Sequence, residues 1–539
     1  MAKHARSTAL PIAAILLLAA AWKTIFLIWD VVPFNSDEAV VALMARHILD
    51  GARPTFFYGQ AYMGSLDAFF IAAGFRLLGE QVWVVRLVQL FLYLGTVWVT
   101  ILIGREAFGS LRTGLLAGLL LAIPTVNVTL YTTATLGGYG EAMLLGSGTL
   151  LLSLVTARRH IFTGEGRRPW LWPGLFGLLA GCGLWANGLS LVFSVPAGLY
   201  LLCAITARRR NWLLPFILAA SAGLLAGSLP WWLYAVQHGP TQLVQELFGN
   251  AVSVEQGPWL LRTGQHLVNF LLLGTTALFG LRPPWSVDWL ALPVLPFVLF
   301  FWASCLVFFA RQMFRPGPDR HAYALLGGVC AVLLAGFLFT AFGVDPSGRY
   351  FLPMAVPLAL AAAQFILCTA RRGWLVAALA ALVVGYQMAG TLQCALRFPP
   401  GLTTQFYEPT IINHRADRAL IDFLRKEGET TGYTNYWVAY PLAFHSQEEL
   451  VFAPRLPYHL DLRYTPRDDR YAPYTARAAA SGRAAYITTR NPALDDYLRE
   501  RFAGLGVDWQ EQQIGDYHVY YRFSRAVHPG EIGLGELRE

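Results

Sequence analysis

The chain has 539 residues, of which 55% are hydrophobic and 14% charged, and its mean hydropathy is +0.45. A soluble protein carries roughly 25% charged residues, so this composition excludes an ordinary soluble protein and indicates a polytopic membrane protein. The net charge of +8 does not indicate nucleic-acid binding. The basic residues stand in short clusters between apolar runs, which is the orientation signal of an inner-membrane protein.

The N-terminal segment predicts an uncleaved first membrane helix. It reads MAKHARSTALPIAAILLLAAAWKTIFLIWD, a basic start followed by a long apolar run. A signal peptide would need a shorter apolar core and a cleavage site. The cysteines along the chain are isolated and show no CxxC spacing, so they indicate neither a metal knuckle nor a disulfide framework.

Apolar runs of about 20 residues predict eleven membrane-spanning helices. The basic clusters between them are assigned to the cytoplasm, which places the N-terminus inside and the C-terminus outside a bacterial inner (plasma) membrane. These clusters are Lys3 with Arg6, Arg105 to Arg112, Arg158 with Arg159, Arg167 with Arg168, Arg208 to Arg210, Arg311 to Arg320, and Arg371 with Arg372. The predicted spans are 9–30, 84–104, 113–125, 139–157, 171–186, 188–207, 212–236, 288–310, 321–343, 350–370 and 373–395.

Two long segments are then expected on the outer side, 31–83 and 237–287. The first contains SLDAFFIAAGFRLLG and the second contains HLVNFLLLGTTALFGLRPPW. The first apolar stretch is short for a span, and a crossing there would put the later basic clusters outside. Both stretches are therefore predicted to be helices lying at the outer membrane surface, and the chemistry of the protein is expected on that face.

Residues 397–539 differ from the membrane part, residues 1–396, because they hold far more charge and contain no stretch that could span a membrane. The spacing of apolar residues in RADRALIDFLRKEG predicts a helix, as does NPALDDYLRERFAGLG with its glycine stop. The stretches TTGYTNYWVAYPLAF, AAYITTR and DYHVYYRF are aromatic and β-branched and predict strands. We therefore expect a small α/β domain in the periplasm or outside the cell.

Two adjacent acids follow the first apolar run, in FNSDEAVVALMARHILDG. Ser36 is suited to cap a helix there and Gly51 to end it, which places Asp37 and Glu38 in the first turn, where the helix dipole favours negative charge. One interpretation is that the two acids merely start a surface helix. The other is that they form part of a catalytic site.

Further charges at the outer face favour the second interpretation. Glu141 stands at the outer entrance of the fourth span, and an acid in a spanning helix usually has a task. Arg349 precedes a span in DPSGRYFLP, and Arg262 and Arg282 lie in the second outer segment, all against the positive-inside trend. These groups suit an anionic lipid headgroup and a hydroxyl acceptor, although Asp345 could simply pair with Arg349.

The order of these motifs resembles that of the GT-C glycosyltransferases, above all the bacterial relatives of protein O-mannosyltransferases and lipid A aminoarabinose transferases. The resemblance covers roughly residues 9 to 395. It includes the acidic pair, the stretch YGQAYMGSLDAFFIAAGFRLLGEQVWVVRLVQL, Glu141, and RYFLPMAVPLAL, which is similar to an Arg-Tyr-x-x-Pro pattern. Aminoarabinose transferases carry a lysine-proline element in the first outer loop, whereas this chain has Gln60 and Tyr62 and no lysine. Transfer of aminoarabinose to lipid A is therefore not expected.

The resemblance implies a sugar donor linked to polyprenyl phosphate and a hydroxyl acceptor. Asp37 is then expected to act as general base, with Glu38 or Glu141 orienting the acceptor, in a single displacement that inverts the anomeric centre. The leaving group is a phosphate, a stable anion, which needs cations rather than a second acid. Arg349 is the first candidate to bind it, because a guanidinium can bind phosphate oxygens in a bidentate manner.

Other side chains are second candidates for binding substrate. Arg282, Arg262 and Tyr350 are assigned to the donor phosphate, and Tyr58, Gln60 and Tyr62 to the sugar or acceptor, although interfacial tyrosines are commonly belt residues. No cofactor is expected. The acids could hold a divalent metal, but no D-x-D element stands near them and no metal ligand is assigned.

The identity of the sugar and the acceptor stays open at this stage, and glycan, lipid and protein acceptors all fit. An alternative from another class is a transporter or flippase for a lipid-linked sugar. Transporters place functional charges near the bilayer midplane, often in repeated halves. This chain shows no repeat and concentrates its charges at the outer rim, which favours an enzyme.

Overall fold

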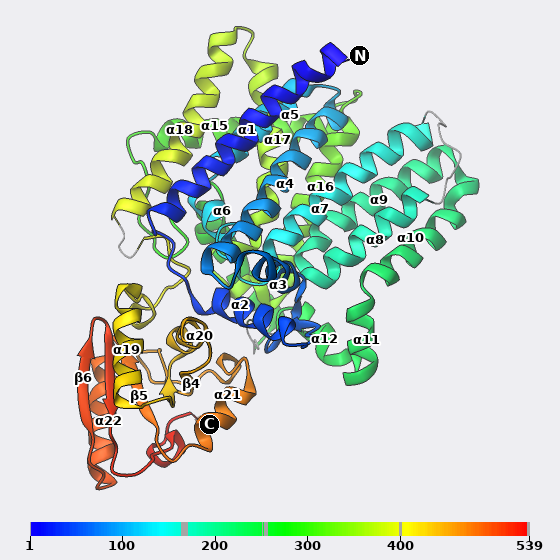
Figure 1. Cartoon of the computed structure of the whole chain (residues 1–539). Coiled ribbons are helices and arrows are strands. Elements are labelled where there is room, and N and C mark those ends of the chain that lie inside the picture. The colour runs from blue at the N-terminus through cyan, green and yellow to red at the C-terminus, as the bar shows by residue number, and fades with distance from the viewer. Residues whose placement is uncertain (1, 163–170, 251, 253–256, 398–400, 536–539) are drawn as a thin grey trace. The chain divides into compact units, whose positions relative to one another are not determined.

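The computed structural model describes residues 2–162, 171–250, 252, 257–397 and 401–535, and the chain forms two compact units (Figure 1). The helical unit comprises Met1–Val31, Ala61–Asp67 and Arg86–Leu402. The C-terminal unit comprises Val32–Gln60, Ala68–Val85 and Thr403–Glu539. Most of the predicted first outer loop therefore belongs to the same compact unit as the C-terminal residues.

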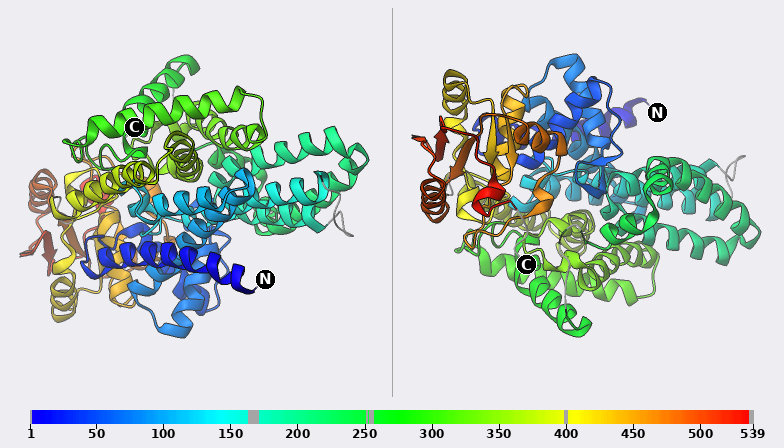
Figure 2. Two further views of the ribbon diagram at one scale, coloured as in Figure 1. Left: turned by 90° about the horizontal axis from the view of Figure 1, so that it is seen from above. Right: turned by 90° about the horizontal axis from the view of Figure 1, so that it is seen from below.

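The helical unit consists of apolar helices joined by short connections. Its α-helices, with α4 counted from Arg86 on, are α1 (Ala2–Ile28), α4 (Val82–Phe108), α5 (Leu111–Ala122), α6 (Val126–Tyr131), α7 (Tyr139–Thr156), α8 (Leu171–Ala186), α9 (Leu191–Arg208), α10 (Leu213–Gly227), α11 (Leu229–His238), α12 (Pro240–Leu247), α13 (Trp259–Asn269), α14 (Thr275–Leu278), α15 (Leu295–Phe314), α16 (Arg320–Phe339), α17 (Ala355–Thr369) and α18 (Gly373–Arg397). Strand β2 (Gln60–Gly64) precedes α3, and 3₁₀ turns at Ala341–Val344 and Arg349–Met354 join α16 to α17. Helices α7 to α10 pack side by side (Figures 1 and 2).

Within the described residues, eight helices are long and apolar enough to cross a membrane. Helices α10 and α11 form one further candidate, bent by 69°. The bend falls at Ser228, just before Pro230, whose ring and missing N–H interrupt a helix. Each predicted span overlaps an apolar helix, but α5 and α8 are shorter than a full span. A multi-pass helical protein is confirmed, whereas the count of eleven is not.

The structure also gives the secondary structure of both outer segments. The apolar stretch of the first segment is helix α3 (Leu66–Leu78), and the second segment contains α13 and α14. Their position at the membrane surface stays a prediction. Of the basic residues assigned to the cytoplasm, Arg167 and Arg168 lie outside the described residues.

The C-terminal unit is built on a mixed five-stranded sheet in the order β4-β3-β5-β7-β6. Strand β3 is parallel to β4 and β5, and β7 is antiparallel to β5 and β6. Its strands are β1 (Phe56–Phe57), β3 (Thr431–Thr434), β4 (Val451–Pro454), β5 (Ala485–Thr489), β6 (Gln510–Ile514) and β7 (Tyr517–Tyr521), and its α-helices are α2 (Ser36–Leu49), α3, α19 (Asp417–Glu427), α20 (Tyr436–His445), α21 (Ala472–Ala479) and α22 (Pro492–Gly504).

Helices cover both faces of this sheet. Because successive strand residues point to opposite faces, Tyr486 of β5 packs in one core with Leu498 of α22. Its neighbour Ile487 packs in a second core with Leu424 of α19 and Leu442 of α20. The predicted α/β domain is confirmed, as are the strands at 485–489 and 517–521 and the helices at 417–427 and 492–504.

One predicted strand is mostly wrong. In TTGYTNYWVAYPLAF only Thr431–Thr434 is extended, and Tyr436–His445 forms helix α20. The helix begins because the side chain of Asn435 accepts a hydrogen bond from the N–H of Trp437. Eight of its ten residues are buried, so apolar residues occur on all sides, and the 3.6-residue period that distinguishes a helix from a strand is absent.

Candidate active site

Asp37 lies in the C-terminal unit, at the first turn of α2. The helix is capped by Asn35, whose side chain accepts from the N–H of Glu38 at 3.1 Å. Ser36, the expected cap, instead donates its hydroxyl proton to the carbonyl oxygen of Tyr436 at 2.5 Å. The hydroxyl of Tyr436 donates to Oδ1 of Asp37 at 2.6 Å. Most residues of α2 are buried, so the helix that the acidic pair starts is not a surface helix.

A half-buried arginine, Arg470, lies near the same carboxylate. The guanidinium of Arg470 is 5.4 Å from the ring centre of Tyr436 and 5.7 Å from that of Phe57. Burial alone would lower the pKa of this guanidinium, but Tyr436, Asp37 and Asp468 raise it above its ordinary value. Burial raises the pKa of the Asp468 carboxyl to about 7, although Arg470 opposes the shift. The cation thus lies in the field of two carboxyl groups.

A second polar network occupies the other end of α2. His47 contacts the hydroxyl of Tyr58 through Nδ1 and Glu448 through Nε2, both at 3.0 Å. Burial would raise the pKa of Glu448, but its bonds with His47 and Tyr474 lower that pKa to about 2. The ring of Tyr58 stacks on Tyr471. Tyr58, assigned to sugar or acceptor binding, is therefore engaged by protein partners.

The remaining candidates of this unit are Glu38 and Gln60. The side chain of Glu38 is fully buried beside Asp37 in the chain, which suits a supporting role more than direct contact with an acceptor. Gln60 is half-buried at the first position of β2. The structure brings Asp37 and Glu38 into one helical turn and places Tyr58 with a different set of partners.

Arg349 lies in the helical unit, at the start of the 3₁₀ turn before α17. Its guanidinium forms an ion pair with Asp345 at 2.6 Å and donates to the hydroxyl of Tyr350 at 3.1 Å. Gly348 before it has φ +80°, and an added Cβ would meet Ala277 at 2.7 Å, so the turn requires glycine. The pairing with Asp345 that the sequence left open is present. The bonds to Asp345 and Tyr350 hold the Arg349 guanidinium in place.

An apolar cavity of about 370 Å³ adjoins this arginine in the helical unit. Tyr62 and Tyr350 line it, together with apolar side chains of α9 and α16 such as Val195 and Phe337. Tyr350 is the hydroxyl that Arg349 contacts. The cavity thus has an apolar interior, which suits a lipid chain, and a guanidinium bonded to one of its lining residues, which suits a phosphate.

Arg282 and Arg262 differ in how their guanidinium groups are used. Every nitrogen of the Arg282 guanidinium donates to protein oxygens, including the carbonyls of Pro283, Leu273 and Pro346 at 2.6 to 2.9 Å. A phosphate would have to displace these bonds, so the contacts favour a structural role. Arg262 on α13 lines a more polar cavity of about 330 Å³ with Thr263 and His266. It is the more accessible of the two second candidates.

Glu141 is buried in the first turn of α7. Near it lies Asp67, a carboxyl group that sequence reasoning had not singled out. Gly138 before the helix has φ +77°, and an added Cβ would lie 2.2 Å from the carbonyl oxygen of Ala186. Asp67, also buried, accepts from the hydroxyl of Thr135 at 2.7 Å and lies in the field of Glu141. Neither carboxylate oxygen of Glu141 has a hydrogen-bond partner among the described residues.

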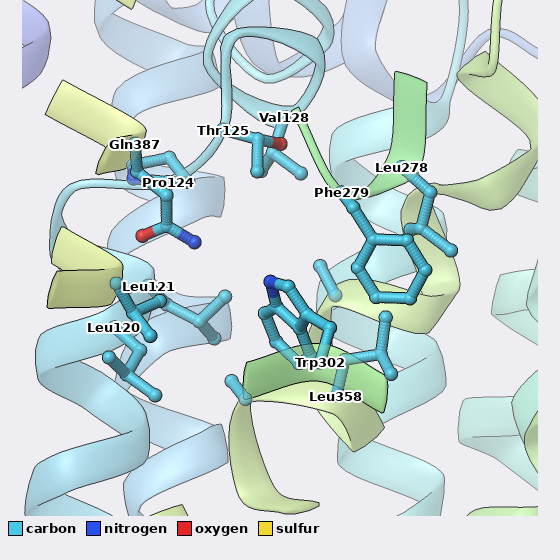
Figure 3. A pocket seen from close by; sticks show the side chains of 13 residues that line it. Leu120, Leu121, Pro124, Thr125, Val128, Leu278, Phe279, Trp302, Leu358 and Gln387 are labelled. Atoms are coloured by element: carbon cyan, nitrogen blue, oxygen red, sulfur yellow. The ribbon is translucent and has the colours of Figure 1, made fainter. Parts of the chain in front are cut away.

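A smaller cavity, of about 30 Å³, lies among the membrane helices of the same unit. Its lining comes from α5, α6, α14, α15, α17 and α18, with Thr125, Trp302 and Gln387 as its polar side chains (Figure 3). None of the predicted site residues lines it. Among the described residues, no group of three His, Cys, Asp or Glu side chains is arranged to hold a metal ion.

Sequence reasoning missed Tyr436, Arg470, Asp468 and Asp67. The first three stand about 400 residues or more from Asp37, and no spacing rule connects them. Only the position of Tyr436, one residue after a helix-capping asparagine, carried a signal. That signal was hidden by the aromatic composition of the segment.

Comparison with known proteins identifies the fold. The sequence profile of the dolichyl-phosphate-mannose-protein mannosyltransferases matches residues 65–234. A search of curated proteins with the sequence found no match.

Two solved structures resemble the chain over most of its length. ArnT from Cupriavidus metallidurans bound to undecaprenyl phosphate is 14% identical, with a TM-score of 0.57 and coverage of 95% of this chain and 97% of that chain. AglB from Archaeoglobus fulgidus in complex with an inhibitory peptide and a dolichol-phosphate is 12% identical, with a TM-score of 0.54 and coverage of 96% and 74%. At these identities the likeness shows the fold, and the predicted GT-C fold and resemblance are confirmed.

Proposed function

We propose that this protein is a membrane glycosyltransferase that moves a sugar from a polyprenyl-phosphate-linked donor to a hydroxyl acceptor at the outer face of the membrane. The observation that carries the proposal is the apolar cavity lined by Tyr62 and Tyr350, with Arg349 bonded to Tyr350. A prenyl chain suits the apolar lining, and a guanidinium suits the phosphate oxygens. Two proteins of the same fold carry undecaprenyl phosphate and dolichol-phosphate.

Asp37 is the proposed general base. The acceptor hydroxyl transfers its proton to the carboxylate while its oxygen attacks the anomeric carbon. The bond from that carbon to the phosphate oxygen breaks, and its electron pair leaves with polyprenyl phosphate. One displacement inverts the anomeric centre. No second acid is needed, because the phosphate leaves as a stable anion.

The other proposed roles follow from burial and partners. Arg349 and Tyr350 hold the phosphate, with Arg262 as the next candidate and Arg282 the weakest, because its donors are engaged. Glu141 orients the acceptor, while Glu38 supports Asp37 from a buried position. Gln60 and the tyrosines Tyr58 and Tyr62 remain candidates for contacting sugar or acceptor.

The proposed location is a bacterial inner membrane, with the N-terminus in the cytoplasm and residues 397–539 in the periplasm or outside the cell. The alternation of basic clusters between the apolar helices supports this orientation. The acceptor is a hydroxyl-bearing glycan, lipid or protein of the cell envelope. The sugar, hexose or pentose, is to be identified by experiment.

A transfer assay tests the proposal directly. Purified protein in detergent is mixed with a labelled undecaprenyl-phosphate sugar and an envelope extract from cells that lack the gene. We expect label in a new product and release of undecaprenyl phosphate, both absent with the Asp37→Asn variant. Recovery of intact donor, together with movement of that donor across the bilayer of reconstituted vesicles, would identify a transporter instead.

A further inference from the structure

We propose that Tyr436 and Arg470 are positioning residues that hold the Asp37 carboxylate in its reactive orientation. Both come from the C-terminal part of the chain, whereas Asp37 follows the first apolar helix. This inference rests on the proposed function and adds two residues to it. All the contacts that carry it lie within the C-terminal unit.

The first contact is a hydrogen bond that selects one oxygen of the carboxylate. Tyr436 donates its hydroxyl proton to Oδ1 of Asp37 at 2.6 Å. The carbonyl oxygen of Tyr436 accepts from the hydroxyl of Ser36, the residue before Asp37. Two bonds therefore join the first residue of α20 to the first turn of α2. With Oδ1 occupied, Oδ2 is assigned to receive the proton of the acceptor hydroxyl.

The position of Tyr436 is itself fixed by the sheet. It is the first residue of α20 and directly follows Asn435, whose side-chain oxygen caps the helix and whose amide donates to Thr489 of β5 at 2.8 Å. Tyr436 is 2% exposed. A side chain anchored in this way holds its hydroxyl with little freedom, so the partner carboxylate loses little orientational freedom on reaction.

The second contribution is the positive charge of Arg470. Its backbone N–H donates to the hydroxyl of Tyr440 at 2.7 Å, and its guanidinium lies over the rings of Tyr436 and Phe57. The backbone of Gly59 also packs against it, since an added Cβ would lie 3.1 Å from Cδ of Arg470. Arg470 thus packs against the ring of the tyrosine that bonds to Asp37, and it supplies positive charge near that carboxylate.

Within the described part of the unit, Asp37 interacts electrostatically with Tyr436, Arg470 and Asp468. Arg470 lies in the field of both carboxyl groups, so its loss would leave both without this cation. We therefore expect a loss of kcat that lysine at position 470 recovers, while the KM for the donor changes little. A residue with a purely structural role would lower stability and activity together, without selective rescue by lysine.

The experiment measures kcat and KM at neutral pH for the parent, Arg470→Gln, Arg470→Lys and Tyr436→Phe. In Arg470→Gln kcat should be about 10- to 100-fold lower, with the KM for the donor nearly unchanged. Arg470→Lys should restore most of the lost kcat. Tyr436→Phe should lower kcat roughly tenfold while leaving the KM for the donor nearly unchanged.

Two matched controls come from the same unit. Tyr497→Phe removes a hydroxyl that donates to the carbonyl of Ile532 at 2.7 Å, and Arg499→Gln removes a cation paired with Glu511 at 3.0 Å. Neither faces Asp37, so both should keep the parent's kcat and KM. If Arg470→Gln fails to fold, Arg470→Lys and Tyr436→Phe carry the test.

The outcomes separate this inference from the proposed function. An active parent whose folded Arg470→Gln variant keeps the parent's kcat, or loses kcat without rescue by lysine, overturns the positioning role alone. An active parent whose Tyr436→Phe variant keeps the parent's kcat does the same. A parent that transfers no sugar overturns the proposed function, and this inference falls with it.

Discussion

The two charged groups at the centre of the proposed reaction are held in opposite ways. Asp37 takes its partner, Tyr436, from 399 residues further along the chain. Arg349 takes its partners, Asp345 and Tyr350, from its own turn. A group held by its chain neighbours can be recognised in a sequence, because the short loop and its charges are visible together. A group held by distant residues can be recognised only as an isolated acid.

The difference also separates the expected roles. The contacts of Asp37 favour one oxygen and leave the other for chemistry. The contacts of Arg349 balance its charge with one carboxylate, so an arriving phosphate has to compete with Asp345. We therefore expect Asp37 variants to affect the chemical step and Arg349 variants to affect binding of the lipid phosphate.

The largest effect is expected for Asp37→Asn. The amide keeps the size of the side chain and an oxygen that accepts from Tyr436, but it cannot take up a proton from the acceptor. Turnover should fall by about 10²- to 10⁴-fold while donor binding survives, as measured by initial rates and by binding of undecaprenyl phosphate.

The control for Asp37→Asn is Asp495→Asn, which alters a carboxylate that accepts from Tyr520 at 2.9 Å in the same unit. It should lower stability with little change in the turnover of folded protein. Near-normal turnover of Asp37→Asn would return the acidic pair to the role of helix-starting acids.

A smaller effect, on binding, is expected for Arg349→Ala. Hydrogen bonds to charged groups contribute about 1.5–3 kcal/mol, so inhibition by free undecaprenyl phosphate should weaken roughly 10- to 100-fold. Arg349→Lys should fall between, because it keeps the charge but loses the planar fork.

Asp345→Asn is the matched variant for this arginine. If Arg349 binds phosphate, removing its competing carboxylate should leave inhibition equal or tighter. If Arg349 is only the structural partner of Asp345, both variants should lower the melting temperature alike and leave the inhibition constant unchanged.

Most of the helical fold could be predicted from sequence because each span has to be a continuous apolar run. The helices over 295–314, 320–339 and 373–397 match the predicted ranges within several residues. The bend at Ser228 and the shortness of α5 and α8 were not visible, because they depend on packing and not on composition. The count of eleven spans is not confirmed for that reason.

The site was predictable in its local parts only. The ion pair between Arg349 and Asp345 was weighed from a four-residue spacing. The Asp37 environment depends on α20, which the sequence presented as a strand because its apolar residues face every direction. Asp67 was not singled out in the sequence, because only the fold places it near Glu141.

A moderate effect is expected for Glu141→Gln. The amide replaces a buried carboxyl group beside Asp67 whose oxygens have no hydrogen-bond partner among the described residues, so the melting temperature should stay level or rise. Turnover should fall about tenfold if the carboxylate orients the acceptor hydroxyl. A lowered melting temperature with unchanged turnover would contradict both parts, and Asp67→Asn measures whether the two acids act together.

The smallest effect on turnover is expected for Asp468→Asn. This variant should mainly change how the free energy of unfolding depends on pH. Burial raises the pKa of Asp468 from its usual range to about 7. The folded state thus binds a proton that the unfolded state releases, and the stabilisation present at pH 4 is lost as pH rises towards 7. Since one pKa unit corresponds to about 1.4 kcal/mol, the parent should lose a few kcal/mol over this range relative to Asp468→Asn.

Denaturant unfolding of both proteins between pH 4 and pH 8 measures the difference. Parallel pH dependence in parent and variant would show that the folded protein does not hold the proton of Asp468. Turnover of the variant at neutral pH should stay within a few-fold of the parent, since Arg470 and Tyr436 remain.

Transfer of a sugar with release of polyprenyl phosphate is tested most directly by a single-turnover reaction. Excess protein is mixed with undecaprenyl phosphate carrying a labelled sugar, and lipid and product are quantified together. We expect one undecaprenyl phosphate released for each sugar transferred, a product of inverted anomeric configuration, and no transfer by Asp37→Asn. Intact donor after incubation with active acceptor extract, or a product that retains the anomeric configuration, would contradict it.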